Sequence, residues 1–166
     1  NGHITLKGGD DCLSTPFGHP TMIALRQEEF NVEFTAEING EIDEGQCSGV
    51  TAFYNGDYHY DIYVTKENGA YFACLRKHVA DIDVVTQACP IDYCGLVRLK
   101  IVANDEWYSF YYESKGQFVE LGRGTTALLC TETNGRSFTG TFLGIFTENG
   151  TINVKNDDSA LGVRNT

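Results

Sequence analysis

The sequence has no long hydrophobic run and few positive charges. No stretch approaches the roughly 20 consecutive apolar residues that a membrane-spanning helix requires, so we expect no membrane-crossing segment. Lysine and arginine together number 12, against 23 aspartate and glutamate residues, which gives a net charge of −11. This charge would repel phosphate backbones and anionic lipid head groups. Nucleic acid and membranes are therefore not expected partners.

Targeting signals and domain linkers are also missing. The N-terminal residues contain neither a basic leader nor an apolar targeting run, so we expect a secretion signal either to lie outside this sequence or not to exist. The location, extracellular or bacterial cytoplasmic, is left open. No linker, repeat or low-complexity segment divides the 166 residues, a length that suits one core. We expect a single domain over residues 1–166.

The cysteines do not have the spacing of a zinc site. Cys89 and Cys94, the nearest pair, lack a second pair or a histidine at ligand spacing. A chain of this length needs no disulfides, and a free cysteine behaves as a small hydrophobe. We therefore expect no metal site at the cysteines and no required cofactor. Free, mostly buried thiols are favoured over disulfides for Cys12, Cys47, Cys74, Cys89, Cys94 and Cys130.

Apolar and polar residues alternate through most of the chain, with a period of two that is typical of half-buried strands. This pattern recurs between residues 21 and 154, and only residues 125–132 favour a short helix. Turn signals separate the segments, because Asn-Gly pairs tolerate the positive φ angles of tight hairpins. These pairs are Asn39-Gly40, Asn55-Gly56, Asn68-Gly69, Asn134-Gly135 and Asn149-Gly150, with Lys115-Gly116 as a weaker signal. The pattern predicts an all-β fold, a two-sheet antiparallel sandwich of the jelly-roll type.

Catalytic motifs are incomplete. The segment 40–44 is similar to the Glu-Ile-Asp-x-Glu signature of laminarinase-type glycosidases, whose three acids share one face of a strand. Here Glu41 and Asp43 share a face but Glu44 points to the other side, so a polar hairpin turn is the favoured interpretation. No local motif pairs a histidine with serine or cysteine, although proximity in the fold stays open. We expect no catalytic residues.

Two strands are predicted to carry a ligand-binding face. If Tyr60, Ile62 and Val64 face the core, the other side of that strand presents His59, Asp61, Tyr63 and Thr65. Packing Tyr108, Phe110 and Tyr112 inward likewise leaves Trp107, Ser109, Tyr111 and Glu113 outward. Flat rings beside hydrogen-bonding groups suit sugars, which present apolar C–H faces and hydroxyls. The alternative is that Trp107 and Tyr111 are buried against a partner domain, or that the two faces are reversed.

Acidic residues gather near both ends of the sequence. Asp10-Asp11 and Asn156-Asp157-Asp158 could supply oxygen ligands for a structural calcium ion if the termini meet in space. Neither cluster has the spacing of an EF-hand, and charged, solvated ends are the favoured interpretation.

Several segments, taken in order, resemble a known family. Residues 9–27 read GDDCLSTPFGHPTMIALRQ, residues 49–65 read GVTAFYNGDYHYDIYVT, and residues 135–145 read GRSFTGTFLGI. They are similar to segments of the C-terminal concanavalin-A-like module of family 43 glycoside hydrolases, of the β-xylosidase and arabinofuranosidase type. Residues 30–38 and 96–122 are similar to two further strand patterns of that module. The chain departs from the pattern at Asp61, at Tyr111 and after Phe146.

The resemblance implies a jelly roll that packs on a catalytic propeller and closes one side of its substrate pocket. Phe138 matches the family's phenylalanine before Thr-Gly, so the resemblance implies that it reaches toward that pocket. We therefore expect a non-catalytic module that binds xylan, xylo-oligosaccharide or a related plant cell-wall polysaccharide. The alternatives are a free-standing sandwich-fold polysaccharide hydrolase or lyase, and a structural interface domain that binds no glycan.

Overall fold

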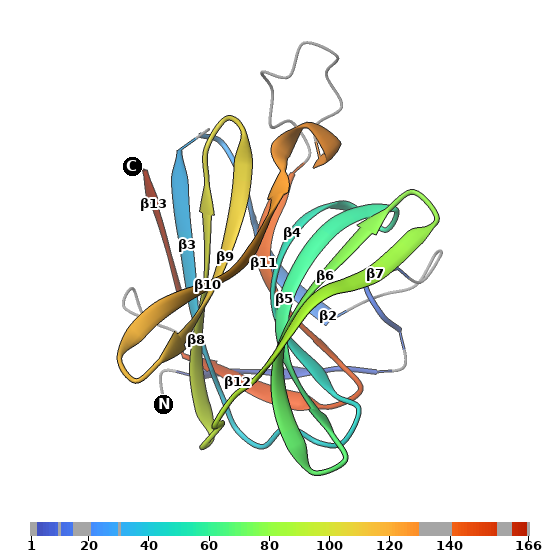
Figure 1. Ribbon diagram of the computed structural model, residues 1–166, viewed down its shortest axis with the longest axis vertical. Coiled ribbons are helices and arrows are strands. Elements are labelled where there is room, and N and C mark those ends of the chain that lie inside the picture. Colours follow the sequence, from blue (N-terminus) through green and yellow to red (C-terminus); the bar gives the residue numbers. More distant parts are fainter. Residues whose placement is uncertain are drawn as a thin grey trace.

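The computed structural model describes residues 3–9, 11–14, 21–29, 31–129, 141–155 and 161–165, most of which lie in two antiparallel sheets (Figure 1). The first sheet has the order β1 (His3–Lys7), β12 (Thr151–Lys155), β3 (Val32–Asn39), β8 (Leu96–Ala103), β9 (Trp107–Ser114) and β10 (Gln117–Thr125), and β13 (Leu161–Asn165) also pairs with β3. The second has the order β2 (Thr21–Arg26), β11 (Phe142–Glu148), β4 (Cys47–Asn55), β5 (Tyr58–Glu67), β6 (Ala70–Val79) and β7 (Ile82–Pro90). The predicted antiparallel sandwich is confirmed.

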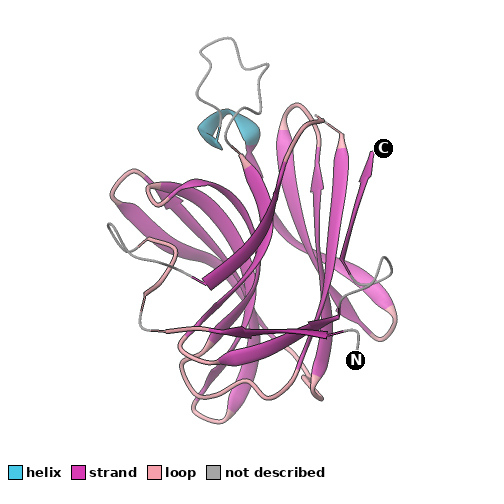
Figure 2. Cartoon of the chain, turned by 180° about the vertical axis from the view of Figure 1, so that it is seen from behind, coloured by secondary structure: helices cyan, strands magenta, loops and turns pink. Residues whose placement is uncertain are grey.

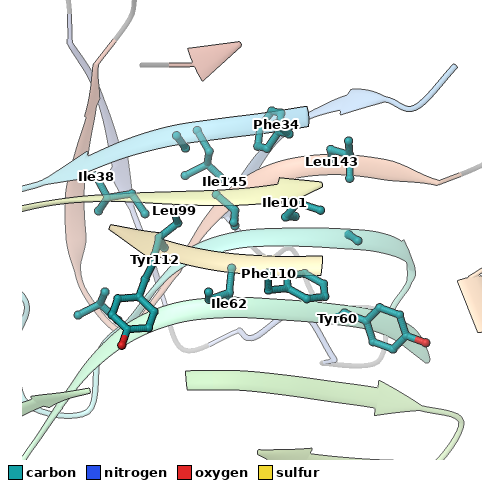
Figure 3. Close-up of a cluster of buried hydrophobic side chains, with 14 of the residues drawn as sticks. Phe34, Ile38, Tyr60, Ile62, Leu99, Ile101, Phe110, Tyr112, Leu143 and Ile145 are labelled. Atoms are coloured by element: carbon teal, nitrogen blue, oxygen red, sulfur yellow. The ribbon is translucent and has the colours of Figure 1, made fainter. Parts of the chain in front are cut away.

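The main core lies between the two sheets and is built from the apolar sides of most strands (Figure 3). Strand β7 contributes no fully buried side chain to it. Phe34 and Ile38 of β3, with their neighbours on β8 and β9, face the apolar residues of β5 and β11. The ring of Tyr60 meets the rings of Tyr108 and Phe110 edge to face, with centroids 6.2 Å apart in both pairs. Because period-2 strands send alternate side chains to one face, the alternation in the sequence identifies this core.

Three of the predicted turns are tight hairpins. Asn55-Gly56 joins β4 to β5, Asn68-Gly69 joins β5 to β6, and Lys115-Gly116 joins β9 to β10. Asn68 and Gly69 have φ angles of 52° and 80°, and Lys115 and Gly116 have 53° and 78°. Positive φ at both central positions is the geometry that matches the twist of hairpin strands.

Two other Asn-Gly pairs are not hairpin turns, which corrects the prediction. The chain after Asn39-Gly40 leaves β3 in one sheet and enters β4 in the other, and Asn149-Gly150 leads from β11 to β12 in the same manner. The side chain of Ile42, two residues after Gly40, is only 2% exposed and packs in the core. The segment therefore passes from one sheet to the other across the core. Asn134-Gly135 lies outside the described residues.

The ends of the described chain contain strands that the sequence pattern did not predict. β1 pairs with β12, and β13 pairs with β3. The helix expected within 125–132 is the short 3-10 turn η1 (Thr126–Leu129), the one helical element among the described residues (Figure 2). No helix in the described part of the chain is long and apolar enough to cross a membrane.

Cys47, Cys74, Cys89 and Cys94 are free thiols, as the sequence favoured. The burial of the described cysteines differs from the prediction, because only Cys74 is fully buried, Cys94 is exposed, and Cys12, Cys47 and Cys89 are half-buried. Burial raises the pKa of Cys47 and of Cys74 to about 11. Cys130 lies outside the described residues.

Candidate functional site

The outer face of the first sheet carries the aromatic and polar row predicted on β9. Trp107, Ser109, Tyr111 and Glu113 are half-buried on this face. The alternate residues Tyr108, Phe110 and Tyr112 are buried in the core. The alternative in which the two faces of this strand are reversed is therefore wrong.

A cation lies over each ring of this row. Arg123 Cζ of β10 is 5.2 Å from the centroid of Trp107, and Lys100 Nζ of β8 is 5.0 Å from that of Tyr111. The same Nζ is 4.2 Å from the centroid of Phe118. Cations over aromatic faces are attracted by the ring quadrupole and hold the rings in place. Strands β8, β9 and β10 thus form one ring-bearing surface, which we call the aromatic face: Trp107, Tyr111, Glu113, Lys100, Phe118 and Arg123.

Hydrogen-bonding groups flank these rings. The hydroxyl of Tyr111 donates to Glu120 Oε1 at 3.3 Å. Partial burial, together with the charge of Glu120, raises the pKa of Tyr111, so its hydroxyl is protonated at neutral pH. Glu113 Oε2 lies 3.8 Å from Arg98 Nη1. Trp107 and Tyr111 are four positions apart on the strand, which is about 13 Å at the rise of a β-strand, so the aromatic face suits an extended chain better than one small molecule.

His59, Asp61 and Tyr63 do not belong to this surface, which corrects the single ligand face expected from the sequence. They lie on β5 in the other sheet, and they are 0%, 0% and 5% exposed. Their side of β5 is covered by residues 11–14, which we call the strap. Leu13 of the strap is 2% exposed and packs in a cluster with Tyr63 and other residues of this sheet. Both sides of β5 are therefore interior.

The strap covers a network of buried charges. Asp61 lies 2.8 Å from His59 Nδ1 and 2.7 Å from Arg76 Nε, and it accepts a hydrogen bond of 2.6 Å from Thr51. Arg76 reaches Glu148 through two bonds of 3.1 and 3.2 Å. Burial alone would raise the pKa of Asp61, but His59, Arg76 and the hydrogen bonds outweigh it and hold this pKa below its usual range.

Ser14, His59 and Asp61 form a hydrogen-bonded series that no local sequence motif indicated. Ser14 Oγ lies 2.9 Å from His59 Nε2, and His59 Nδ1 lies beside Asp61. The same hydroxyl is 3.1 Å from Nδ1 of His78, whose ring stacks on His59 with centroids 5.1 Å apart. His59 and Asp61 are fully buried, whereas Ser14 is half-buried and its hydroxyl is shared between His59 and His78. The contacts hold the strap on the sheet, with Leu13 N donating to Glu148 at 2.9 Å.

The laminarinase-like segment is a connection between the sheets. Glu41 and Asp43 are exposed, and Glu44 accepts hydrogen bonds from the backbone N–H groups of Asn68 and Gly69 in the β5–β6 turn. Glu44 therefore holds the β5–β6 turn in place. Glu41 and Asp43, which would share one face of a strand, lie in an irregular segment instead.

Two other predicted sites fall largely on parts of the chain that are not described. Phe138 lies outside the described residues, as do Asp10, Asn156, Asp157 and Asp158 of the calcium hypothesis. Within the described ranges, no group of three or more histidine, cysteine, aspartate or glutamate residues is placed to hold a metal ion. Calcium binding stays a prediction.

The two antiparallel sheets form a jelly-roll sandwich whose first sheet carries the aromatic face on its outer side. Residues 1–157 match the family described as the β-xylosidase C-terminal concanavalin A-like domain, and the chain belongs to this family. The family is the non-catalytic C-terminal domain of family 43 glycoside hydrolases, so this chain is a non-catalytic module.

Several proteins that are similar to this chain are about three times as long. A non-reducing end α-L-arabinofuranosidase, BoGH43B of Bacteroides ovatus, is 30% identical over 159 residues, which cover 95% of this chain and 30% of that protein. A solved structure from the same organism, titled as a xyloglucan PUL GH43B, has a TM-score of 0.82 at 25% identity and is covered to 33%. A xylan β-1,4-xylosidase from Bacillus halodurans shares the fold, with a TM-score of 0.80 at 19% identity over 92% of this chain and 31% of its own. The chain spans about a third of each.

Proposed function

We propose that this module binds a neutral plant cell-wall polysaccharide, xylan or xylo-oligosaccharide first, on the aromatic face. The observation that carries the proposal is the row of Trp107, Tyr111 and Glu113 on one strand, with rings and hydrogen-bonding groups side by side. Sugars offer apolar C–H faces to such rings and hydroxyls to the carboxylates and amines between them. The family's association with β-xylosidases supports xylan as the ligand.

The cations over the rings fit this role. Arg123 and Lys100 cover one side of Trp107 and Tyr111, and both cations have carboxylate neighbours, Glu120 at 3.9 Å and Glu33 at 3.6 Å. The rings are thus oriented before a ligand arrives, so less side-chain freedom is lost on binding. In the intact enzyme the bound polysaccharide would be kept near a catalytic domain. We propose that this domain is a propeller packed against the module.

A second candidate ligand is xyloglucan, because one similar solved structure is of a protein named for a xyloglucan PUL. The rival function in another class is a structural interface domain that binds no glycan, in which the aromatic face is covered by the catalytic domain.

Affinity electrophoresis of the 166-residue chain in gels of xylan, xyloglucan, mixed-linkage β-glucan and mannan tests the proposal. We expect retardation in xylan and a roughly fivefold or greater loss of affinity in Trp107→Ala and in Tyr111→Ala, since stacking contacts contribute about 1 kcal/mol or more each. Leu25→Ala is the matched control, because Leu25 is 50% exposed on the other sheet. Retardation in xyloglucan alone would move the preference to that polymer, and retardation in none would support the interface domain.

A further inference from the structure

A hollow is lined by the connection from β7 to β8 and by the end of β9 with the β9–β10 turn. It encloses about 370 Å³, which falls at the lower end of the range of small-molecule sites, about 300–1,000 Å³. One wall comes from residues 90–97 and the other from residues 112–116. We call it the end cleft.

The walls of the end cleft are held by internal contacts. Tyr93 OH donates to the carbonyl oxygen of Gly40 at 2.5 Å, and its ring lies 5.2 Å from that of Tyr71. On the inner side, Tyr112 OH is 3.2 Å from Cys89 Sγ. The opposite wall ends in the tight Lys115-Gly116 turn. The cleft is therefore formed in advance of any ligand.

The lining combines an uncovered apolar surface with polar groups of both signs. Leu96 is 49% exposed here, next to the half-buried Ile91 and Tyr93. Asp92 and Glu113 contribute carboxylates, which accept hydrogen bonds, and Lys115 contributes an ammonium group, which donates them. Two carboxylates against one ammonium disfavour an anionic ligand, as does the net charge of −11. A neutral polyol ring meets each of these requirements.

We propose that the end cleft binds one end of a neutral oligosaccharide of the xylan type, which continues from there along the aromatic face. This inference rests on the proposed glycan binding and adds a second subsite to it. Glu113 joins the two, since it stands in the outward row of β9 and also lines the cleft. A chain end in the cleft gives the module a preference for oligosaccharides and chain termini over the middle of a polymer.

The test is an amide chemical-shift titration of the ¹⁵N-labelled chain with xylohexaose, beside calorimetry of two variants. We expect saturable shifts at residues 91–97 and 114–116 together with shifts on β9 and β10. The double variant Asp92→Asn/Leu96→Ala changes two exposed side chains of the cleft alone, and its affinity for xylohexaose should fall about tenfold, the loss expected when a charged hydrogen-bond acceptor is removed. Leu25→Ala should bind as the unchanged protein does.

The outcomes separate the inference from the function on which it rests. Shifts at the end cleft that persist in Trp107→Ala would support a distinct subsite. Shifts confined to β8, β9 and β10, with unchanged affinity in the double variant, would overturn the end cleft and leave the aromatic face intact. An absence of shifts everywhere at millimolar xylohexaose would overturn both.

Discussion

Replacing Arg76 with methionine is expected to lower the free energy of unfolding by about 3–5 kcal/mol, because the change leaves buried carboxylates without their cation. Arg76 is only 12% exposed, and it bridges Asp61 of β5 to Glu148 of β11 through three bonds. Urea denaturation followed by circular dichroism measures the loss. Arg123→Met is the matched control, because the side chain of Arg123 is 51% exposed and such pairs contribute little.

The loss in Arg76→Met should depend on pH with a definite sign. The pKa of Asp61 is held below its usual range in the folded protein, so Asp61 contributes stability above the unfolded pKa of about 3.9. That contribution is lost as the pH falls through the lower, folded pKa. The difference between the two proteins should therefore be largest near neutral pH and shrink on acidification. A loss below about 1 kcal/mol, or one that grows toward acid pH, would contradict the role given to Arg76.

Gly49→Ala is expected to destabilise the protein by about 3 kcal/mol or more, because overpacking against backbone atoms cannot relax by side-chain rotation. A Cβ atom at Gly49 would stand 2.0 Å from the carbonyl oxygen of Ile62 and 2.5 Å from Cα of Tyr63. β4 would have to move away from β5. This movement would also disturb the surface of β5 that the strap covers. Thermal unfolding measures the effect.

Gly9→Ala is the control for this substitution. No atom outside its chain neighbours lies within 4 Å of a Cβ placed at Gly9. Its stability should stay within about 0.5 kcal/mol of the unchanged protein, as for most surface substitutions. Equal losses in the two variants would show that general glycine effects, rather than the contact between β4 and β5, set the cost.

The sequence predicts the orientation of β9 because one of its faces is strongly apolar. Tyr108 and Phe110 alternate with polar or amphipathic residues, and a one-residue slip would expose both rings. The hairpins at Asn68-Gly69 and Lys115-Gly116 are equally local, since they depend on φ angles at two adjacent residues. The jelly-roll architecture, by contrast, is indicated by the resemblance of several segments, in the same order, to one family.

The burial of β5 could not be predicted in the same way. A side chain such as Asp61 suggests solvent, because charged residues are rarely fully buried without partners. Its direct partners Thr51, His59 and Arg76 lie within 15 residues of it, on β4, β5 and β6. The strap that covers them comes from a distant part of the sequence and is attached through the contacts of Ser14 with His59 and of Leu13 with Glu148. Only the fold brings them together, so the pattern of alternation assigns the wrong environment to His59, Asp61 and Tyr63.

Both candidate subsites, the aromatic face and the end cleft, lie apart from the buried network of Asp61, Arg76 and Glu148. The aromatic face and the end cleft lie at β8, β9 and β10 and the connection that leads into β8, whereas Asp61, Arg76 and Glu148 lie in the second sheet. Variants of the network should therefore alter stability, and variants of the two subsites should alter binding. This division allows each set of substitutions to serve as a control for the other.

The most direct test of glycan binding uses Trp107, the only tryptophan in the sequence. Its indole lies on the aromatic face beside Arg123, so its emission reports on that face alone. Titration with xylohexaose should change the intensity or wavelength of tryptophan fluorescence saturably, and Tyr111→Ala should need about fivefold more ligand for the same change. Emission that stays constant up to millimolar xylohexaose, in a chain that is retarded by xylan gels, would place binding elsewhere and contradict the assigned face.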